Sequence, residues 1–206
     1  MLKATYEKYW DFFRARRDGS KAWEDYTPYE LRNVSAFIRL GWRERAAELL
    51  DYFYADQRPH AWNQWAEVVG RDPRAPRFLG DMPHGWISSD YIRAALDCFA
   101  YEREADHALL LAEGVPTAWL AGDGVGLQGL RTPYGPLSYT LAQQGGQLTL
   151  RIAAMPTIPP GGLIYTWPWP GAPAAASLNG QPVTWQGRQI AITSLPAVLH
   201  IDGAPF

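Results

Sequence analysis

The sequence predicts an α+β protein in which an antiparallel helical region precedes a small antiparallel β-sandwich. Two observations predict this fold class. Up to about residue 112 the apolar residues recur at intervals of three and four, as on one face of a helix, and after Val115-Pro116 they alternate, as along a strand. We therefore expect a helical region over residues 1–112 and a β-sandwich domain over residues 113–206.

The first two helices are predicted from periodicity and from their end signals. Over residues 2–17 an apolar face is followed by a cluster of arginines and then by Gly19, which is typical of a helix C-terminus. Thr27 and Pro28 supply an N-cap and a first-turn proline for the second helix, and Glu30 supplies the glutamate of a capping box.

Two more helices and one shorter helical turn complete the expected helical region. A third helix is predicted over residues 42–54, and the segment 60–70, HAWNQWAEVVG, is predicted to form a short helix. The fourth helix is predicted over residues 88–104, with Ser88 or Ser89 as its cap. Between the third and fourth helices, a long continuous helix is excluded by the prolines at positions 59, 73, 76 and 83.

The sandwich is predicted from short alternating segments separated by turn residues. Residues 137–142 and 148–152 alternate in polarity on either side of QQGG, which predicts a β-hairpin. Asn179-Gly180 and Gln186-Gly187 are further turns. The remaining strands are expected at residues 163–167, 175–178, 182–185, 189–193 and 197–201.

Composition excludes several classes of function. With a formal net charge of −2 over 206 residues, the chain has no positive field to attract nucleic acid or an anionic membrane, so we expect neither as a partner. No stretch approaches the roughly 20 apolar residues that a membrane span needs. The first residues, MLKATYEKYWDFFRARR, carry charges throughout, unlike a signal peptide. These features predict a soluble cytoplasmic protein.

The cysteine and aromatic contents point to a packed core. The only cysteine, Cys98, lies in the fourth expected helix and is expected to be a buried core thiol, and a single thiol excludes an internal disulfide or a thiolate metal cage. Most of the ten tryptophans and eleven tyrosines are expected in the core. Their flat amphipathic rings are also surfaces on which sugar rings stack.

Four pieces of the sequence carry a resemblance to a known family. They are GDMPHGWISSDYIRAALDCFAYERE at residues 80–104, LLLAEGVPTAWLAGDGVGLQGLRTPYGPLSYTL at 109–141, SLNGQPVTWQGRQIAI at 177–192 and LPAVLHI at 195–201. In this order they resemble the C-terminal region of large bacterial glycoside hydrolases built on an (α/α)6 toroid with an appended β-sandwich. The resemblance covers about residues 20–201 and depends on the order of the pieces.

The resemblance implies a partial, toroid-like helical region and a glycosidase that cleaves a small glycoside or oligosaccharide by carboxylate acid and base chemistry. Four helices cannot form six helix pairs, so apolar helix faces are expected to be exposed, which predicts a homo-oligomer, most simply a dimer. Two alternatives stay open. One is a non-catalytic carbohydrate-binding or accessory module left from a larger glycosidase, with the WPWP segment at residues 167–170 binding glycan; the other is a structural fragment without activity.

Three segments place acids beside aromatic rings, as glycoside hydrolysis requires. The first is Trp23-Glu24-Asp25-Tyr26, which loosely resembles the W-E-K-Y segment around a catalytic glutamate of toroid trehalases. On that analogy Glu24 is a general base, Asp25 is a second candidate acid and Trp23 contacts substrate. The alternative is a pair of solvated acids near a helix N-terminus, where the helix dipole favours them.

The second segment runs from His60 to Glu67. If it is helical, Trp62 and Trp65 share one face and Asn63 and Glu67 share another. Glu67 near tryptophan is then a candidate general acid, because an apolar environment raises the pKa of a carboxyl group. Trp62, Trp65 and Asn63 are candidate sugar contacts. The alternative is two core tryptophans with an exposed glutamate.

The third segment is RFLGDMPHGW, where Gly80 permits an unusual backbone conformation ahead of the fourth helix. Asp81 and His84 are candidates to hydrogen-bond sugar hydroxyls, and Asp81 is also a candidate catalytic acid. Trp86 is a candidate sugar platform. The alternative is that Asp81 stabilises its own turn and that His84 is a hydrogen-bonded core histidine.

The sequence contains no motif for a metal site, a phosphate-binding loop or a nucleophilic serine. The histidines at positions 60, 84, 107 and 200 have no HxxxH or HxH spacing, so no metal site is predicted. GDGVGLQG at residues 122–129 lacks the Lys-Ser/Thr ending of a phosphate-binding loop, and no GxSxG segment marks a nucleophilic serine. We therefore expect no cofactor.

Overall fold

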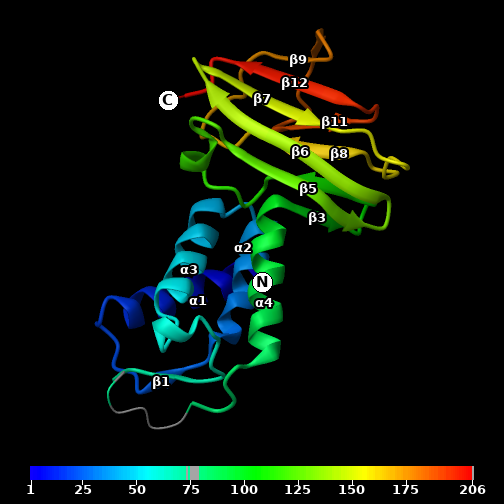
Figure 1. The fold of residues 1–206 in the computed structure, drawn as a ribbon. Helices are drawn as coiled ribbons and strands as arrows, with labels where there is room; N and C mark the ends of the chain where they lie inside the picture. Colours follow the sequence, from blue (N-terminus) through cyan, green and yellow to red (C-terminus); the bar gives the residue numbers. More distant parts are fainter. Residues whose placement is uncertain (73, 75–78, 206) are drawn as a thin grey trace. The chain divides into compact units, whose positions relative to one another are not determined.

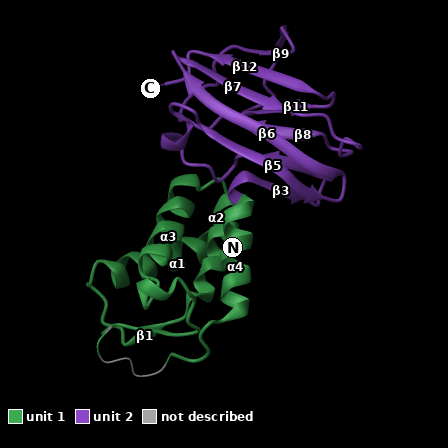
Figure 2. Ribbon diagram, in the orientation of Figure 1, with its two compact units in different colours: residues 1–97 green, residues 98–206 purple. Residues whose placement is uncertain are grey.

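A computed structural model describes residues 1–72, 74 and 79–205 of the chain. The protein is a mixed α+β protein, and its chain divides into two compact units, Met1–Asp97 and Cys98–Phe206 (Figure 2). Pro73 and Pro76, together with Arg77 and Phe78 of the RFLGDMPHGW segment, lie outside the described residues. No helix in the described residues is both long enough and apolar enough to span a membrane.

The described part of the first unit contains four α-helices (Figure 1). The helices expected over residues 2–17 and 42–54 are present as α1 and α3, because their apolar positions recur on one face. The core between the helices is aromatic, with Phe13, Phe37 and Phe53 fully buried. The helical elements are α1 (Leu2–Arg17), η1 (Pro28–Leu31), α2 (Arg32–Arg39), α3 (Arg43–Ala55) and α4 (Gly85–Phe99).

The expected second helix begins as a 3₁₀ turn, η1, and only one of its two predicted caps is present. Thr27 is the N-cap, and its hydroxyl accepts a bond from the backbone N–H of Tyr29 at 3.4 Å. The capping-box prediction for Glu30 is wrong. Its carboxylate instead accepts hydrogen bonds from the guanidinium of Arg16 at 2.7 and 2.8 Å and from the hydroxyl of Tyr9. The buried guanidinium requires a counter-charge, which outweighs the capping interaction.

The described residues between α3 and α4 are mostly irregular. The helix predicted over residues 60–70 is wrong beyond its first turn, η2 (His60–Trp62), because Asn63 adopts the left-handed conformation with φ 49° and ends the turn. Further on, β2 (Val69–Gly70) pairs antiparallel with β1 (Asp25–Tyr26). The residues around Glu67 are therefore neither helical nor part of a regular strand.

The helix α4 begins and ends earlier than the predicted range of residues 88–104. The helix begins at Gly85, so neither Ser88 nor Ser89 is its cap. The Ser88 hydroxyl instead donates to the carbonyl of His84 at 3.0 Å, one turn earlier. The C-terminal residues of the expected helix form β3 (Ala100–Arg103), which pairs with β4 (Ala108–Leu111). Strands therefore begin before residue 112, because the run Ala108–Leu111 is buried on both faces, as in a central strand.

The second unit contains two sheets. A six-stranded sheet has the order β10-β9-β12-β7-β6-β5, and a four-stranded sheet has the order β11-β8-β4-β3. The prediction of antiparallel strands is confirmed except for one parallel pair, β4 with β8. The bounds are β5 (Val125–Thr132), β6 (Gly135–Gln144), β7 (Gln147–Ile152), β8 (Leu163–Thr166), β9 (Ala176–Leu178), β10 (Gln181–Val183), β11 (Gln189–Ile192) and β12 (Ala197–Asp202), with a 3₁₀ turn η3 (Thr117–Leu120) before β5.

The predicted alternation accounts for how the sheets pack. One face of each sheet contributes to a single hydrophobic core, which includes Leu141 and Leu150 from the larger sheet and Tyr165 and Ile190 from the smaller. The β6–β7 hairpin pairs Gln144 with Gln147 around the predicted turn. The predicted Asn179-Gly180 turn is also present, with both residues at positive φ.

Candidate functional site

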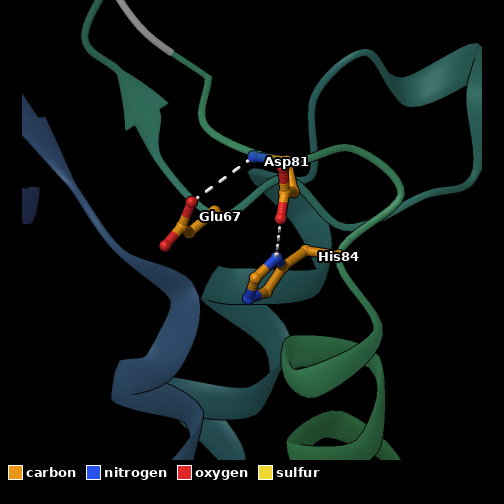
Figure 3. Close-up of side chains that lie close together, drawn as sticks. All are labelled: Glu67, Asp81 and His84. Atoms are coloured by element: carbon orange, nitrogen blue, oxygen red, sulfur yellow. Dashed lines mark hydrogen bonds and ion pairs between the residues drawn. The ribbon is translucent and has the colours of Figure 1, made fainter.

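Glu67, Asp81 and His84 come together in the first unit (Figure 3). One carboxylate oxygen from each acid and one ring nitrogen of the histidine all lie within 4.8 Å of one another. Two of these residues come from the third candidate segment of the sequence and one from the second. The first segment, around Glu24, does not contribute to this cluster.

Backbone hydrogen bonds bring the two segments together. Residues 79–84 run antiparallel to residues 65–68, with His84 N–H donating to the Trp65 carbonyl at 2.7 Å and Glu67 N–H donating to the Asp81 carbonyl at 3.0 Å. A third bond joins Val68 N–H to the Leu79 carbonyl at 3.0 Å. Because this pairing lies outside the regular strands, alternation of polarity in the sequence gives no signal for it.

Gly80 permits the close approach of Glu67. Its φ is +61°, and a Cβ at this position would lie 2.2 Å from Oε2 and 2.7 Å from Cβ of Glu67. The space left by the missing side chain holds the Glu67 carboxylate, which accepts a long bond of 3.4 Å from Asp81 N–H (Figure 3). Both the backbone conformation and the packing therefore require glycine.

His84 is buried and oriented by a tyrosine. Only 7% of its surface is exposed, and its Nε2 lies 2.8 Å from the hydroxyl of Tyr29 in η1. Its Nδ1 faces the acids and lies 3.9 Å from Oδ2 of Asp81. Burial raises the pKa of Tyr29 above its ordinary value; the charges of Glu67 and Asp81 act in the same direction, and the guanidinium of Arg32 opposes them.

An open hollow lies beside the cluster. It has a volume of about 400 Å³ and is lined by Asp81, Met82, Pro83, His84, Gly85 and Trp86. Trp86 is 72% exposed, and its ring packs edge-on against His84, with 5.9 Å between ring centroids. A second hollow of about 400 Å³, bounded by Arg32, Ser89 and Asp90, also includes Trp86. The indole therefore contributes to two adjoining depressions.

The other residues of the second candidate segment separate from one another. Trp65 is buried at 6% exposure and packs against Tyr91, whereas Trp62 is 63% exposed. The expectation that both tryptophans share one helical face is wrong, because the chain turns at Asn63, which is itself exposed. Trp65 is thus a core residue that supports the neighbouring Glu67.

The first candidate segment lies further along the β1–β2 pair. Asp25 pairs with Gly70, three residues beyond Glu67, which corresponds to about 10 Å of extended chain. Glu24 and Asp25 are both exposed, and the ring of Trp23 packs against Tyr26. In the sandwich, Trp167 of the WPWP segment is buried in the core rather than exposed.

Sequence reasoning missed the role of Tyr29 and the convergence of two acids on a histidine. Histidine spacing predicted no metal site, because the cluster contains only one histidine and its other two members are acids. The only sequence signal was an acid and a histidine three residues apart in a segment rich in glycine and proline. Tyr29 lies 55 residues from His84, so spacing could not connect them.

Comparison with known proteins gives only weak structural similarity. No protein family and no curated protein matches the chain. A solved structure, the GH127 β-L-arabinofuranosidase Ara127N from Geobacillus stearothermophilus T6, matches with a TM-score of 0.31 and 10% identity. The match covers 56% of this chain and 18% of that one. At this level the comparison transfers no residue roles, and four α-helices in the described residues do not make a complete six-pair toroid.

Proposed function

We propose that this chain hydrolyses the glycosidic bond of a small glycoside, with Glu67 and Asp81 as its pair of carboxyl groups. The observation that supports this most directly is their approach to within 4.8 Å beside an open hollow lined by Asp81, His84 and Trp86. Glycosidases need two carboxyl groups on either side of the scissile bond, and their separation depends on the stereochemical course.

The separation of the acids favours retention of configuration. Retaining glycosidases hold their carboxyl groups about 5 Å apart, whereas inverting enzymes leave room for a water molecule between them. Asp81 has a side chain that is 86% exposed and lines the hollow, so it is positioned as the nucleophile. Glu67 is half-buried and is the group that would protonate the leaving oxygen.

The residues around the acids are suited to binding a sugar. Trp86 presents an exposed indole to the hollow, and aromatic faces stack on the C–H face of a sugar ring. Tyr29 fixes the ring of His84 through Nε2, so that the imidazole keeps a constant orientation towards Asp81. A bound glycoside would contact Trp86 on one side and the acids on the other.

The test is hydrolysis of a panel of nitrophenyl glycosides by the full chain. We expect activity that falls at least 10²-fold in Glu67→Gln and in Asp81→Asn, with the fold unchanged by circular dichroism. Glu24→Gln is the matched control, because Glu24 is exposed and lies outside the cluster. No turnover by the wild-type protein, or loss of activity in Glu24→Gln but not in Glu67→Gln, would contradict the proposal.

A second candidate function, carbohydrate binding without catalysis, is favoured by the exposure of Asp81 and Trp86. An acid that is 86% exposed is well solvated, which suits hydrogen bonding to sugar hydroxyls as well as nucleophilic attack. Saturable quenching of tryptophan fluorescence by a sugar, lost in Trp86→Ala and without turnover of any glycoside, would establish this function instead.

A further inference from the structure

Among the described residues, neither acid of the cluster has a lysine or arginine as its partner. In the part of the chain that the structure describes, no lysine or arginine forms an ion pair with Glu67 or with Asp81; the one charged contact of Asp81 is with His84. Two carboxylates held within 4.8 Å of each other repel, and a cation between them would relieve that repulsion. The cluster therefore has the electrostatic character of a cation site.

The buried His84 supplies a third donor atom, and its contact with Tyr29 accounts for the orientation of its ring. More than nine-tenths of the His84 side chain is buried, and its Nδ1 points at the carboxylates (Figure 3). When Nε2–H donates to the Tyr29 hydroxyl, Nδ1 carries the lone pair that a metal ion needs. Histidines that ligate metals are commonly held in this way by an acceptor on the second ring nitrogen.

The distances are compatible with a single small cation. Zinc binds carboxylate oxygen and imidazole nitrogen at about 2.0–2.2 Å, so two ligand atoms at the tetrahedral angle on one ion are roughly 3.3–3.6 Å apart. Asp81 Oδ2 and His84 Nδ1 are 3.9 Å apart, and all three donor atoms lie within 4.8 Å. A small movement of the exposed Asp81 side chain completes the set, while Gly80 leaves the space in which the Glu67 carboxylate is held.

We infer that Glu67, Asp81 and His84 form a binding site for one divalent transition-metal cation of the Zn²⁺ type. Three protein ligands would leave a fourth position of a tetrahedral ion for water or a hydroxyl group, and two of these ligands, Asp81 and His84, also line the hollow at Trp86. The imidazole and the small ligand number favour Zn²⁺ over Mg²⁺ and Ca²⁺, which take six or more oxygen ligands.

Cation binding and the proposed hydrolysis use the same oxygen lone pairs. Where the inference concerns catalysis, it rests on the proposed function: a Zn²⁺ ion bound to Glu67 and Asp81 prevents one from donating a proton and the other from attacking carbon. Zn²⁺ would therefore inhibit glycoside hydrolysis by the metal-free protein, and a chelator would restore it. Cation binding itself does not depend on the proposed function.

The experiment is calorimetric titration of Zn²⁺ into the full chain after removal of metal with a chelator. We expect one ion per chain and at least tenfold weaker binding in Asp81→Asn, in which an exposed side chain changes and the fold is undisturbed. His84→Gln tests the buried ligand in the same way, with circular dichroism as its fold check. His60→Gln is the matched control, because His60 is exposed and outside the cluster.

The outcomes separate the two proposals. Binding of Zn²⁺ that is unchanged in Asp81→Asn, absence of binding, or equal affinity for Mg²⁺ would overturn the cation site. If Zn²⁺ binds and depends on Asp81 but metal-free protein hydrolyses no glycoside, the cation site stands and the proposed hydrolase function fails. If metal-free protein is active and Zn²⁺ neither binds nor inhibits, the hydrolase function stands and the cation site fails.

Discussion

The Nε2 atom of His84 lies 2.8 Å from the hydroxyl of Tyr29, which connects the residue before α4 to the 3₁₀ turn before α2. This bond fixes the ring that faces Asp81 and Glu67. Tyr29 itself does not belong to the three-residue cluster. Its effect on the site therefore passes through His84, which makes it a positioning residue.

Tyr29→Phe tests this positioning role. Loss of one partly buried hydrogen bond is expected to cost about 1 kcal/mol of unfolding free energy. Because the imidazole is then less firmly oriented, Zn²⁺ affinity is expected to fall about tenfold. The measurements are urea unfolding and calorimetric titration, with Tyr54→Phe, at a solvent-exposed tyrosine, as the control. Unchanged Zn²⁺ affinity in Tyr29→Phe would show that the ring is held by packing alone.

Gly80→Ala tests the space beside Glu67. The substitution costs about 1–2 kcal/mol for an alanine at positive φ and also displaces the Glu67 carboxylate, which a Cβ would approach to 2.2 Å. Gly41→Ala is a matched control, since Gly41 has φ +74° but nothing within 4 Å of its Cβ position. Both variants are expected to lose stability in urea, whereas Gly80→Ala alone loses hydrolysis and Zn²⁺ binding. Equal losses of function would contradict the packing argument.

Glu30→Gln tests the ion pair inside the helical unit. Both nitrogens at the end of the Arg16 guanidinium donate to the Glu30 carboxylate, and the Arg16 side chain is only 2% exposed. Removing the counter-charge leaves a buried cation, which is expected to cost about 3–5 kcal/mol of unfolding free energy. Asp11→Asn breaks the exposed Arg14–Asp11 pair and is expected to cost less than about 0.5 kcal/mol. Similar costs in thermal unfolding would contradict the burial argument.

Sequence periodicity predicted the elements whose hydrogen bonds are local. The helix α1 and the β6–β7 hairpin are confirmed because each buries one face of a regular element. The prediction of a helix after His60 was wrong because one residue, Asn63, adopts a left-handed conformation, which helix propensities do not reveal. Local pattern therefore identified the segments of the candidate site but misassigned the conformation of the segment that contains Glu67.

The geometry of the candidate site depends on non-local contacts. Glu67 and Asp81 are 14 residues apart, and they meet because irregular backbone pairing and the absence of a side chain at Gly80 allow it. Sequence reasoning named both acids and His84 separately, but gave no reason to place them together. The sequence also could not predict that Tyr29 orients His84, because this contact depends on how η1 packs against the segment before α4.

Tyr26 provides a test of pH dependence. Its pKa is raised far above the ordinary value of 10.0, first by burial and then by the charge of Asp56, whose carboxylate accepts a hydrogen bond from the Tyr26 hydroxyl at 2.6 Å. Since the unfolded chain loses this proton more readily, the stabilisation is complete below about pH 10 and declines as the pH rises further. In urea titrations the wild-type midpoint is expected to fall more steeply between about pH 9 and pH 11 than that of Tyr26→Phe. Parallel curves would contradict the assignment.

The outer surface of α4 provides the test of self-association. Ile92 and Leu96 are four residues apart on this helix and are 57% and 38% exposed, so they form an apolar strip on one face. Exposed apolar helix faces commonly mark contact surfaces, and a second copy of the chain would cover the strip in a two-fold dimer. Light scattering coupled to size exclusion is expected to show a dimer at micromolar concentration. Ile92→Glu should convert it to a monomer, whereas Leu2→Glu, at an exposed position of α1, should not. A wild-type protein that is already monomeric under these conditions would mean that the strip is not a dimer interface.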